Sequence, residues 1–587
     1  MQRLRTYRLR LVLLLSVCLL HLLPAARGQQ MGWQSAAGFG SDDQQRGYQD
    51  AYAKTISDAA GNRYMLGNCP AFMSFGSVGV APTGSLAGFL MKLDAQDVPQ
   101  WVVTINGATG LNGGWFSDVC LGPDGRLYVT GGYTPGSSLD GGATVLPDQG
   151  SFLAIYTPLG QLVQTEVLSH SAGTGVAAAT CVAVLDSTTC IITGAVYATA
   201  TFGGWPITLP RNNTAAQPFV ARYSLQTHTT TWLTIASVSR SSGSPFVLTD
   251  GRYCYVSGTY YGTGTLFGTS LPPGPNHYNG GAYAACLDSA GNVVWMQRYW
   301  EGVGVNAIPP WQTKPTLIGD ALSVIAVTDP SVQFSSPGQP LPTLGSGFNP
   351  YWLRFDTQTG ALRRVVPLTA TVAPNVFGGV GVGVRYASPP RLLPDGLYWG
   401  GGYAGTVDFG PVVGSRTLPA GSPGDAFVAK FDTSGVCQWL VTAASTSGAM
   451  FSPSVVSDLD VTAAGAVRVA GLFNGPTSFG STTLIPGGFL DFFVGTVARV
   501  NGLPDEDAAR EEGMALFPNP AHDVVRLQLA RPAESAESVS ILDGVGRVVR
   551  CVVVPRGSRE FSLDVAELPA GIYVVRCGAT ARRLVVK

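Results

Sequence analysis

Charged residues are scarce in this chain of 587 residues. Lysine, arginine, aspartate and glutamate together make up 12% of the sequence, about half of the roughly 25% that is usual in globular proteins. The 36 basic and 37 acidic residues leave a net charge of -1 and are scattered along the chain. A nucleic-acid partner needs a basic surface against its phosphates, so none is expected.

Residues that commonly carry catalysis are rarer still. The sequence has five histidines, and between residues 29 and 502 its only glutamates are Glu166 and Glu301. It contains no HExxH or other metal-binding histidine spacing, no CxxC pair, and no Gly-x-Ser-x-Gly elbow between a strand and a helix. We therefore expect no metal or other cofactor. Enzymatic activity stays open, with the balance against it, and would have to rely mainly on aspartates.

Long apolar runs are absent except near the N-terminus. Residues 11–23 form one such run, which follows four arginines and precedes the small residues Ala26 and Gly28. Thirteen residues are fewer than the roughly 20 that a membrane-spanning helix needs. The layout is that of a secretory signal peptide covering residues 1–28, so we expect export and no transmembrane segment.

Cysteine gives little guidance. Most of the cysteines after residue 28 lie in apolar strand-like runs, where a cysteine usually acts as a small buried hydrophobe. The best candidates for a disulfide are Cys551 and Cys577, which both lie near the C-terminus. The pairing stays open from sequence.

What the chain has in abundance is glycine, 75 residues, arranged in a repeat. A strand that ends in glycine or alanine recurs seven times, 63 to 74 residues apart, at residues 64–67, 128–131, 191–194, 255–258, 323–326, 398–400 and 469–471. An aromatic-led strand follows each of them by 21 to 27 residues, at Phe89, Phe152, Phe219, Tyr283, Tyr351, Phe427 and Phe493. Two markers in the same phase indicate a repeat architecture.

Each repeat predicts four antiparallel strands, which in the second unit cover residues 117–121, 127–131, 152–156 and 162–168. A tryptophan or another apolar residue opens the fourth strand in most units. The seventh unit lacks a fourth strand, and residues 31–38, with Trp33, have the pattern of one. The prediction is an all-β, seven-bladed β-propeller over residues 29–502, in which the N-terminal strand closes the last blade.

These units resemble the bacterial β-propeller repeat family of secreted and cell-surface proteins. Residues 427–432, FVAKFD, carry the closest copy of its motif. The resemblance covers about 470 residues, supports the propeller architecture, and implies no fixed catalytic residues.

An acidic, turn-like stretch at residues 503–513 predicts a linker. Beyond it, residues 514–587 show six alternating segments typical of a small β-sandwich, at 524–529, 538–542, 548–554, 560–563, 571–577 and 582–587.

This tail resembles the C-terminal sorting domain, type A, of the type IX secretion system of Bacteroidota. The motifs that carry the resemblance are LFPNPAHD at 516–523, the turn at 542–548, LPAGIYV at 568–574 and LVVK at 584–587. Within them we expect the sorting signal to include Phe517, Pro518, Asn519, Pro520, Gly571, Tyr573 and Lys587. The resemblance implies passage through the periplasm, recognition of the folded tail by the secretion machinery, and a secreted or surface location.

Aromatic residues outside the blade framework are the best candidates for ligand binding. We single out Trp300 and Trp311, which flank residues 302–310, and the pair Tyr260 and Tyr261, because exposed rings can stack on sugars or pack on proteins. The leading hypothesis is a non-enzymatic module that binds a glycan or a protein. The alternatives are a polysaccharide hydrolase or lyase with an aspartate-based site on the propeller face, and a structural surface component.

Overall fold

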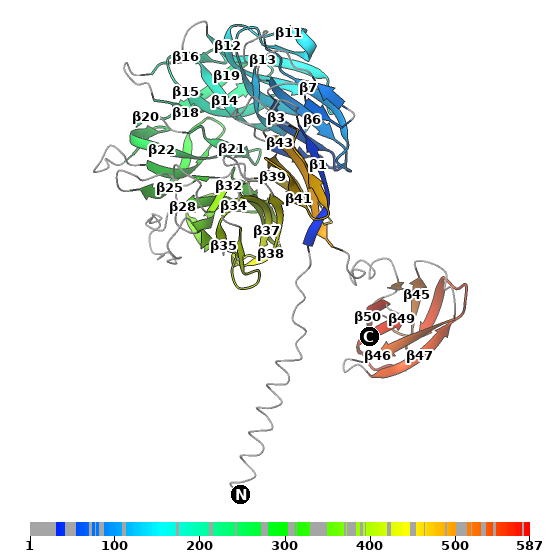
Figure 1. Cartoon of the computed structure of the whole chain (residues 1–587). Coiled ribbons are helices and arrows are strands. Elements are labelled where there is room, and N and C mark those ends of the chain that lie inside the picture. The colour runs from blue at the N-terminus through cyan, green and yellow to red at the C-terminus, as the bar shows by residue number, and fades with distance from the viewer. Residues whose placement is uncertain are drawn as a thin grey trace. The chain divides into compact units, whose positions relative to one another are not determined.

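The computed structural model (Figure 1) describes residues 31–40, 54–500 and 514–587, apart from gaps inside the last two ranges. The longest gaps are 81–86, 272–279, 303–310, 329–348, 373–382, 446–453 and 530–535. The chain divides into two compact units, residues 1–499 and residues 500–587. The predicted signal peptide and acidic linker lie outside the described residues.

The first unit is built from repeated antiparallel sheets. In the second of them, β8 (Trp115–Leu121), β9 (Leu127–Tyr133), β12 (Gln149–Tyr156) and β13 (Leu162–Ser171) lie side by side in chain order. These four strands are the ones predicted from the alternation and turn residues of the second repeat. Strand order that follows chain order, repeated from sheet to sheet, defines the blades of a β-propeller.

Five further sheets among the described residues have the same order, and a sixth differs only in that its fourth strand, β1, comes from the N-terminal end of the chain. Their strands are β2 (Lys54–Ser57), β3 (Arg63–Cys69), β6 (Ala87–Leu93) and β7 (Pro99–Thr104) in sheet one; β14 (Ala177–Asp186), β15 (Thr189–Val196), β18 (Gln217–Ser224) and β19 (Thr229–Ile235) in sheet three; β21 (Phe246–Thr249), β22 (Cys254–Leu266), β24 (Gly280–Leu287) and β25 (Val293–Gly302) in sheet four; β27 (Thr316–Ile318), β28 (Ala321–Thr328), β29 (Asn349–Asp356) and β30 (Leu362–Pro367) in sheet five; β33 (Arg391–Leu393), β34 (Gly396–Ala404), β37 (Asp425–Phe431) and β38 (Cys437–Ser445) in sheet six; and β39 (Val455–Val461), β40 (Val467–Phe473), β43 (Asp491–Arg499) and β1 (Met31–Phe39) in sheet seven.

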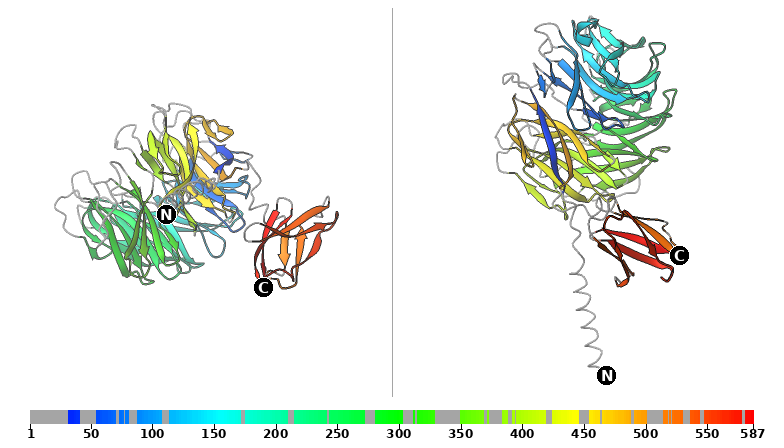
Figure 2. Two further views of the ribbon diagram at one scale, coloured as in Figure 1. Left: turned by 90° about the horizontal axis from the view of Figure 1, so that it is seen from below. Right: turned by 90° about the vertical axis from the view of Figure 1, so that its right-hand side faces the viewer.

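The N-terminal strand completes sheet seven, as the sequence predicts. Strand β1 pairs antiparallel with β43, from Met31 opposite Arg499 to Phe39 opposite Phe492. Figures 1 and 2 show β1 in blue beside the orange strands of this sheet. The Trp33 indole N–H also donates to the backbone oxygen of Thr442 in sheet six, at 2.9 Å. The two ends of the propeller sequence are therefore held together by backbone hydrogen bonds.

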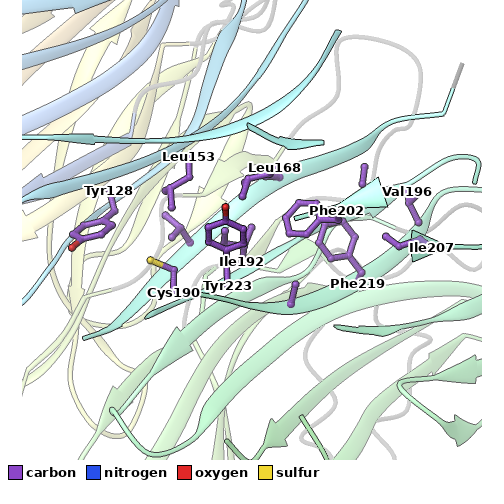
Figure 3. Packing of buried hydrophobic residues seen from close by; sticks show 14 of the residues in the cluster. Tyr128, Leu153, Leu168, Cys190, Ile192, Val196, Phe202, Ile207, Phe219 and Tyr223 are labelled. Atoms are coloured by element: carbon purple, nitrogen blue, oxygen red, sulfur yellow. The ribbon is translucent and has the colours of Figure 1, made fainter. Parts of the chain in front are cut away.

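Apolar side chains fill the space between each sheet and the next. Figure 3 shows one such core, in which Leu153 of sheet two packs with Ile192, Phe219 and Tyr223 of sheet three. Equivalent clusters join every consecutive pair of sheets. The last of the series joins sheet seven to sheet one through residues that include Phe492 and Phe89, so the series of cores closes on itself.

Three of the tryptophans that open fourth strands bind the next sheet. The indole N–H of Trp101 donates to the oxygen of Pro158 at 3.1 Å, and Trp232 and Trp295 donate to Ser289 and Thr357 in the same way. A positive-φ glycine of each receiving turn packs against the ring. At Gly291, for example, an added Cβ would lie 2.7 Å from the Trp232 ring. The repeat thus places Trp and Gly where neighbouring blades need them.

Short hairpins inserted between the second and third strands were not predicted. They are formed by β4 and β5 (Met73–Phe75, Val78–Val80), β10 and β11 (Ser138–Leu139, Thr144–Val145), β16 and β17 (Ala200–Phe202, Trp205–Ile207), the end of β22 with β23 (Thr269–Ser270), β35 and β36 (Thr406–Asp408, Ser415–Thr417), and β41 and β42 (Thr477–Phe479, Thr482–Leu484). Several pair with the chain that follows the fourth strand of the preceding sheet, as Asn106 does with Ser138. The hairpins therefore add backbone links between neighbouring blades.

The second unit is a sandwich of two sheets. One contains β44 (Met514–Phe517), β45 (Val524–Leu529) and β48 (Glu560–Asp564), and the other has the order β47 (Val548–Val554), β46 (Glu537–Leu542), β49 (Gly571–Cys577) and β50 (Thr580–Val586). All six predicted segments are strands, and β44 is additional. A core that includes Val525, Ile541 and Val575 lies between the sheets.

The candidate disulfide between Cys551 and Cys577 is wrong, since both cysteines are free. Cys577 is buried in the sandwich core, whereas Cys551 is exposed. The two residues lie on opposite faces of the same sheet because Cys551 is paired with Ser540, whereas Cys577 is paired with the adjacent residue, Val539. Side chains alternate between faces along a strand, so sulfurs at these two positions cannot meet.

Candidate functional site

The four aromatic positions expected to bind a ligand lie close together along the backbone of sheets four and five. Tyr260 and Tyr261 lie in the middle of β22, opposite Gly281 and Gly280 of β24. Trp300 is opposite Ala282 on the other side of β24. Trp311 lies in β26 (Trp311–Gln312), which pairs with β28 and also contacts β22. The side chains of Trp300 and Trp311 are outside the described part of the structure.

The two tyrosines differ in exposure. Tyr260 is only 4% exposed and belongs to the core between sheets three and four, so its ring stabilises the framework. Tyr261 is half-buried. Burial raises the pKa of the Tyr261 hydroxyl, against the opposing charge of Arg240. At neutral pH this hydroxyl is therefore protonated and can donate a hydrogen bond.

Charged side chains that the sequence analysis did not single out gather where the first strands of the sheets meet. Strand β8 contacts β2 and β14, and β39 contacts β2, so the first strands lie on the inner side of the propeller. We call Lys54, Asp118, Lys314, Arg391 and Asp458 the axial cluster.

Asp118 of sheet two is the centre of this cluster and is 2% exposed. Its two carboxylate oxygens lie 3.1 Å from the ammonium nitrogens of Lys54, in sheet one, and Lys314, two residues before the first strand of sheet five. Its Oδ2 also accepts the backbone N–H of Val182, in sheet three, at 3.1 Å. One carboxylate therefore joins four sheets, and the bond to Lys314 connects sheets that are not neighbours in the chain order.

Electrostatics fix the charge state of this group. Burial alone would raise the pKa of the Asp118 carboxyl, but Lys314 and Lys54 outweigh that effect and hold the pKa well below its usual range. Burial alone would lower the pKa of the Lys314 ammonium, but the charge and hydrogen bond of Asp118, together with Cys181 and Cys120, raise it. Asp118 is ionised at neutral pH and cannot serve as a general acid there.

A second carboxylate of the cluster ties sheets seven, one and six. Oδ2 of Asp458 accepts the backbone N–H of Thr55 at 2.8 Å, and its Oδ1 lies 3.8 Å from the guanidinium of Arg391. Burial raises the pKa of Asp458, and Arg391 opposes that shift. Both acidic groups of the cluster are engaged by the protein's own donors.

The aspartates of the turns cap the backbone of those turns. Asp288 accepts the backbone N–H groups of Ala290 and Asn292, each at 2.9 Å, and Asp432 accepts those of Ser434 and Val436. Such bonds hold a tight turn closed. They use the carboxylate oxygens that an aspartate-based catalytic site would need.

Two of the rare ionisable residues of the propeller meet between sheets two and three. The buried Glu166 accepts hydrogen bonds from Gln164 and Tyr223, both at 2.6 Å, and its Oε1 lies 2.8 Å from Nδ1 of His228. His228 has a φ of 56°, which is uncommon for a residue other than glycine. The pair links the two sheets, and sequence spacing gave no sign of it.

In the sandwich, the residues of the expected sorting signal connect its two ends. Oδ1 of Asn519 accepts the N–H of Val585 at 2.9 Å, and the Lys587 N–H donates to Ala521 at 2.9 Å. The Tyr573 hydroxyl donates to Pro569 at 2.7 Å, while Gly571 is opposite Val586. Phe517 is opposite Arg526 in the backbone register; its side chain, like Pro518 and Pro520, lies outside the described residues.

The chain is thus a β-propeller followed by a β-sandwich whose first motif is bound to its last strand. Residues 515–587 match the family described as the secretion system C-terminal sorting domain. The sandwich is the sorting domain of a type IX secretion system, which directs the chain to the cell surface or the exterior and implies interaction with that machinery.

Several solved structures are distantly similar to the chain. They include a protein of unknown function from Dyadobacter fermentans (8% identity, TM-score 0.35, 79% of this chain and 99% of that one) and the β-propeller domain of the Trilobed protease from Pyrococcus furiosus (8%, 0.32, 76% and 94%). A third is a europium-containing methanol dehydrogenase (9%, 0.31, 76% and 93%). At these TM-scores the propeller assignment rests on the sheet order.

No curated protein matches the sequence. Within the described ranges, no helix is long and apolar enough to cross a membrane. No three His, Cys, Asp or Glu residues of the described part come together as a metal site would require.

Proposed function

We propose that the propeller is a non-enzymatic module that binds a glycan or a protein outside the cell. The proposed surface is the end of sheets four and five where Tyr261, Trp300 and Trp311 lie. The observation that carries the proposal is the convergence of these backbone positions from β22, β25 and β26, three strands of two neighbouring sheets. Aromatic rings on a protein surface can provide the stacking contacts that sugar and protein ligands use.

The charged groups of the propeller support binding over catalysis. Asp118 and Asp458 are held by lysine, arginine and backbone donors, and the turn aspartates Asp288 and Asp432 accept backbone N–H groups. Carboxylates used in this way are poorly suited to move between protonation states during turnover.

The test uses the mature full-length protein on a glycan array and in a pull-down from the medium in which the host grows. Trp300→Ala and Trp311→Ala should each weaken a confirmed interaction by about tenfold or more, as for a buried aromatic contact. The matched control is Trp205→Ala, an exposed tryptophan on the hairpin of sheet three, which should bind normally. An empty array together with an empty pull-down would refute the proposal.

Two alternatives have distinct outcomes. Turnover of a polysaccharide that substitution of one loop aspartate abolishes would replace binding by a hydrolase or lyase. High copy number with an ordered assembly at the surface, and no ligand, would indicate a structural component.

A further inference from the structure

The sheet β47-β46-β49-β50 of the sorting domain has one face that the domain itself does not cover. Its inward residues, such as Ile541, Val575 and Leu584, are fully buried in the sandwich core. Because side chains alternate along a strand, the residues between them point outward. Among these, Val548 is 57% exposed, Ile572 60% and Val574 40%.

Strand register joins these outward residues into one surface. Leu542 lies opposite Val548 on one side and Val574 on the other, and Ile572 lies opposite Val585. Residues directly opposite one another in a sheet share a face and touch. We call these five residues the apolar band. It crosses all four strands of the sheet.

Folding of the domain does not account for the band. An exposed valine or isoleucine contributes little to the core, and soluble proteins seldom expose contiguous apolar surface unless it binds something. The band nevertheless lies within the motifs at 542–548, 568–574 and 584–587 that carry the resemblance to sorting domains. The inward residues of these motifs build the core, so the outward ones need another explanation.

We propose that the apolar band is the surface by which the sorting domain docks on the type IX secretion machinery. One margin of the band is basic, since Arg576 follows Val574 by two residues on the same face and Arg583 lies opposite Val574 in the register. Arg547, which precedes Val548, is paired with Asp543 at 2.9 Å. The complementary receptor is an apolar groove with acidic groups at its rim, the usual anatomy of a protein interface. The inference rests on the sorting assignment and is independent of what the propeller binds.

The double variant Ile572→Thr with Val574→Thr tests the proposal in the full-length chain, expressed in a bacterium that has the type IX system. Its extracellular fraction should fall by about tenfold or more while the chain accumulates in the periplasm, because two interface residues lose apolar contact. Val524→Thr is the matched control: Val524 is 46% exposed on β45 of the other sheet. It should be secreted like the wild type.

Two further measurements separate docking from other causes. The unfolding midpoint of the purified double variant should equal that of the wild type, because both residues are exposed. A photoreactive residue at Ser540, next to the band on the same face, should crosslink to a component of the secretion machinery, and the same residue at Val524 should not. Light scattering should give the same molecular mass for the wild type and the double variant.

Three results would overturn the proposal. One is normal secretion of the folded double variant. Another is an equal secretion loss in Val524→Thr, which would point to the domain as a whole. The third is a change in oligomeric mass with unaltered secretion and no crosslink to the machinery, which would make the band a contact between two copies of this chain.

Discussion

Replacing Asp118 by asparagine should destabilise the propeller, because it removes the charge that holds Lys54 and Lys314. Breaking a buried ion pair by removing one partner costs about 3–5 kcal/mol. Asparagine can retain the hydrogen bond from Val182, and both ammonium groups are partly exposed, so we expect about 2–3 kcal/mol. The entropy of unfolding of about 470 residues is near 1 kcal/mol/K, which converts this loss into a fall of about 2–3 °C in Tm.

The assay is thermal unfolding of the mature full-length protein, followed by tryptophan fluorescence at several pH values. The folded-state pKa of Asp118 lies below its usual value, so its stabilising contribution is complete above the unfolded-state pKa of about 4. It is lost as the pH falls toward the folded-state pKa. The difference between wild type and variant should therefore be constant near neutral pH and shrink in acid.

Asp320→Asn is the control for this experiment. Asp320 forms an exposed ion pair with Arg363 at 2.7 Å, and exposed pairs add little to stability. Its Tm should not change measurably. If Asp118→Asn unfolds at the wild-type temperature, or if its deficit grows in acid, the axial cluster does not hold the sheets together.

Three further outcomes follow from the fold. Gly291→Ala should lower the free energy of unfolding by about 2–4 kcal/mol in a denaturant titration, because it adds backbone strain at positive φ and a clash with the Trp232 ring. Gly251→Ala is the control: Gly251 has a φ of +90° and nothing within 4 Å of an added Cβ, so this variant should show the cost of the strain alone. Deleting residues 31–38 should lower the unfolding midpoint more than any single substitution, and a truncated protein that melts like the intact one would contradict closure by β1. The exposed Cys551 thiol should be alkylated in the native protein. Hydrogen bonds from Ser538 and Ser540 lower the pKa of this thiol, so replacing both serines by alanine should shift the pH midpoint of alkylation upward. An unchanged midpoint would refute that cause.

The parts of the fold that were predictable are those set by local pattern. A strand ending in glycine, an aromatic-led strand and a tryptophan recur with the repeat, and each acts on its own sheet or on a neighbouring one. Trp232 and the turn of Gly291, for instance, are separated by about one repeat and meet because the repeat fixes their phase. The pattern of β1 was legible for the same reason, since its Trp33 marks a fourth strand.

The parts that were missed depend on distance in the chain or on short elements. Lys54 and Lys314 are 64 and 196 residues from Asp118. No periodicity in the sequence predicts that residues so far apart are in contact. The inserted hairpins have strands of two or three residues, too short for alternation to be visible. The Cys551–Cys577 pairing failed because spacing in sequence does not say which face of a sheet each cysteine occupies.

The axial cluster and the proposed binding surface share one segment of chain. Trp311 is in β26, and Lys314 is three residues further on, before β27 begins. The contacts of the fourth-strand tryptophans and of the hairpins link neighbouring sheets, whereas the Lys314–Asp118 bond joins sheets two and five. A ligand that fixes Trp311 also restricts the segment that carries Lys314, so the two sites should be coupled.

We expect a ligand identified on the array to raise the Tm of the wild type more than that of Asp118→Asn, measured at equal saturation. Equal shifts would mean that residues 311–318 do not transmit binding to the centre of the propeller.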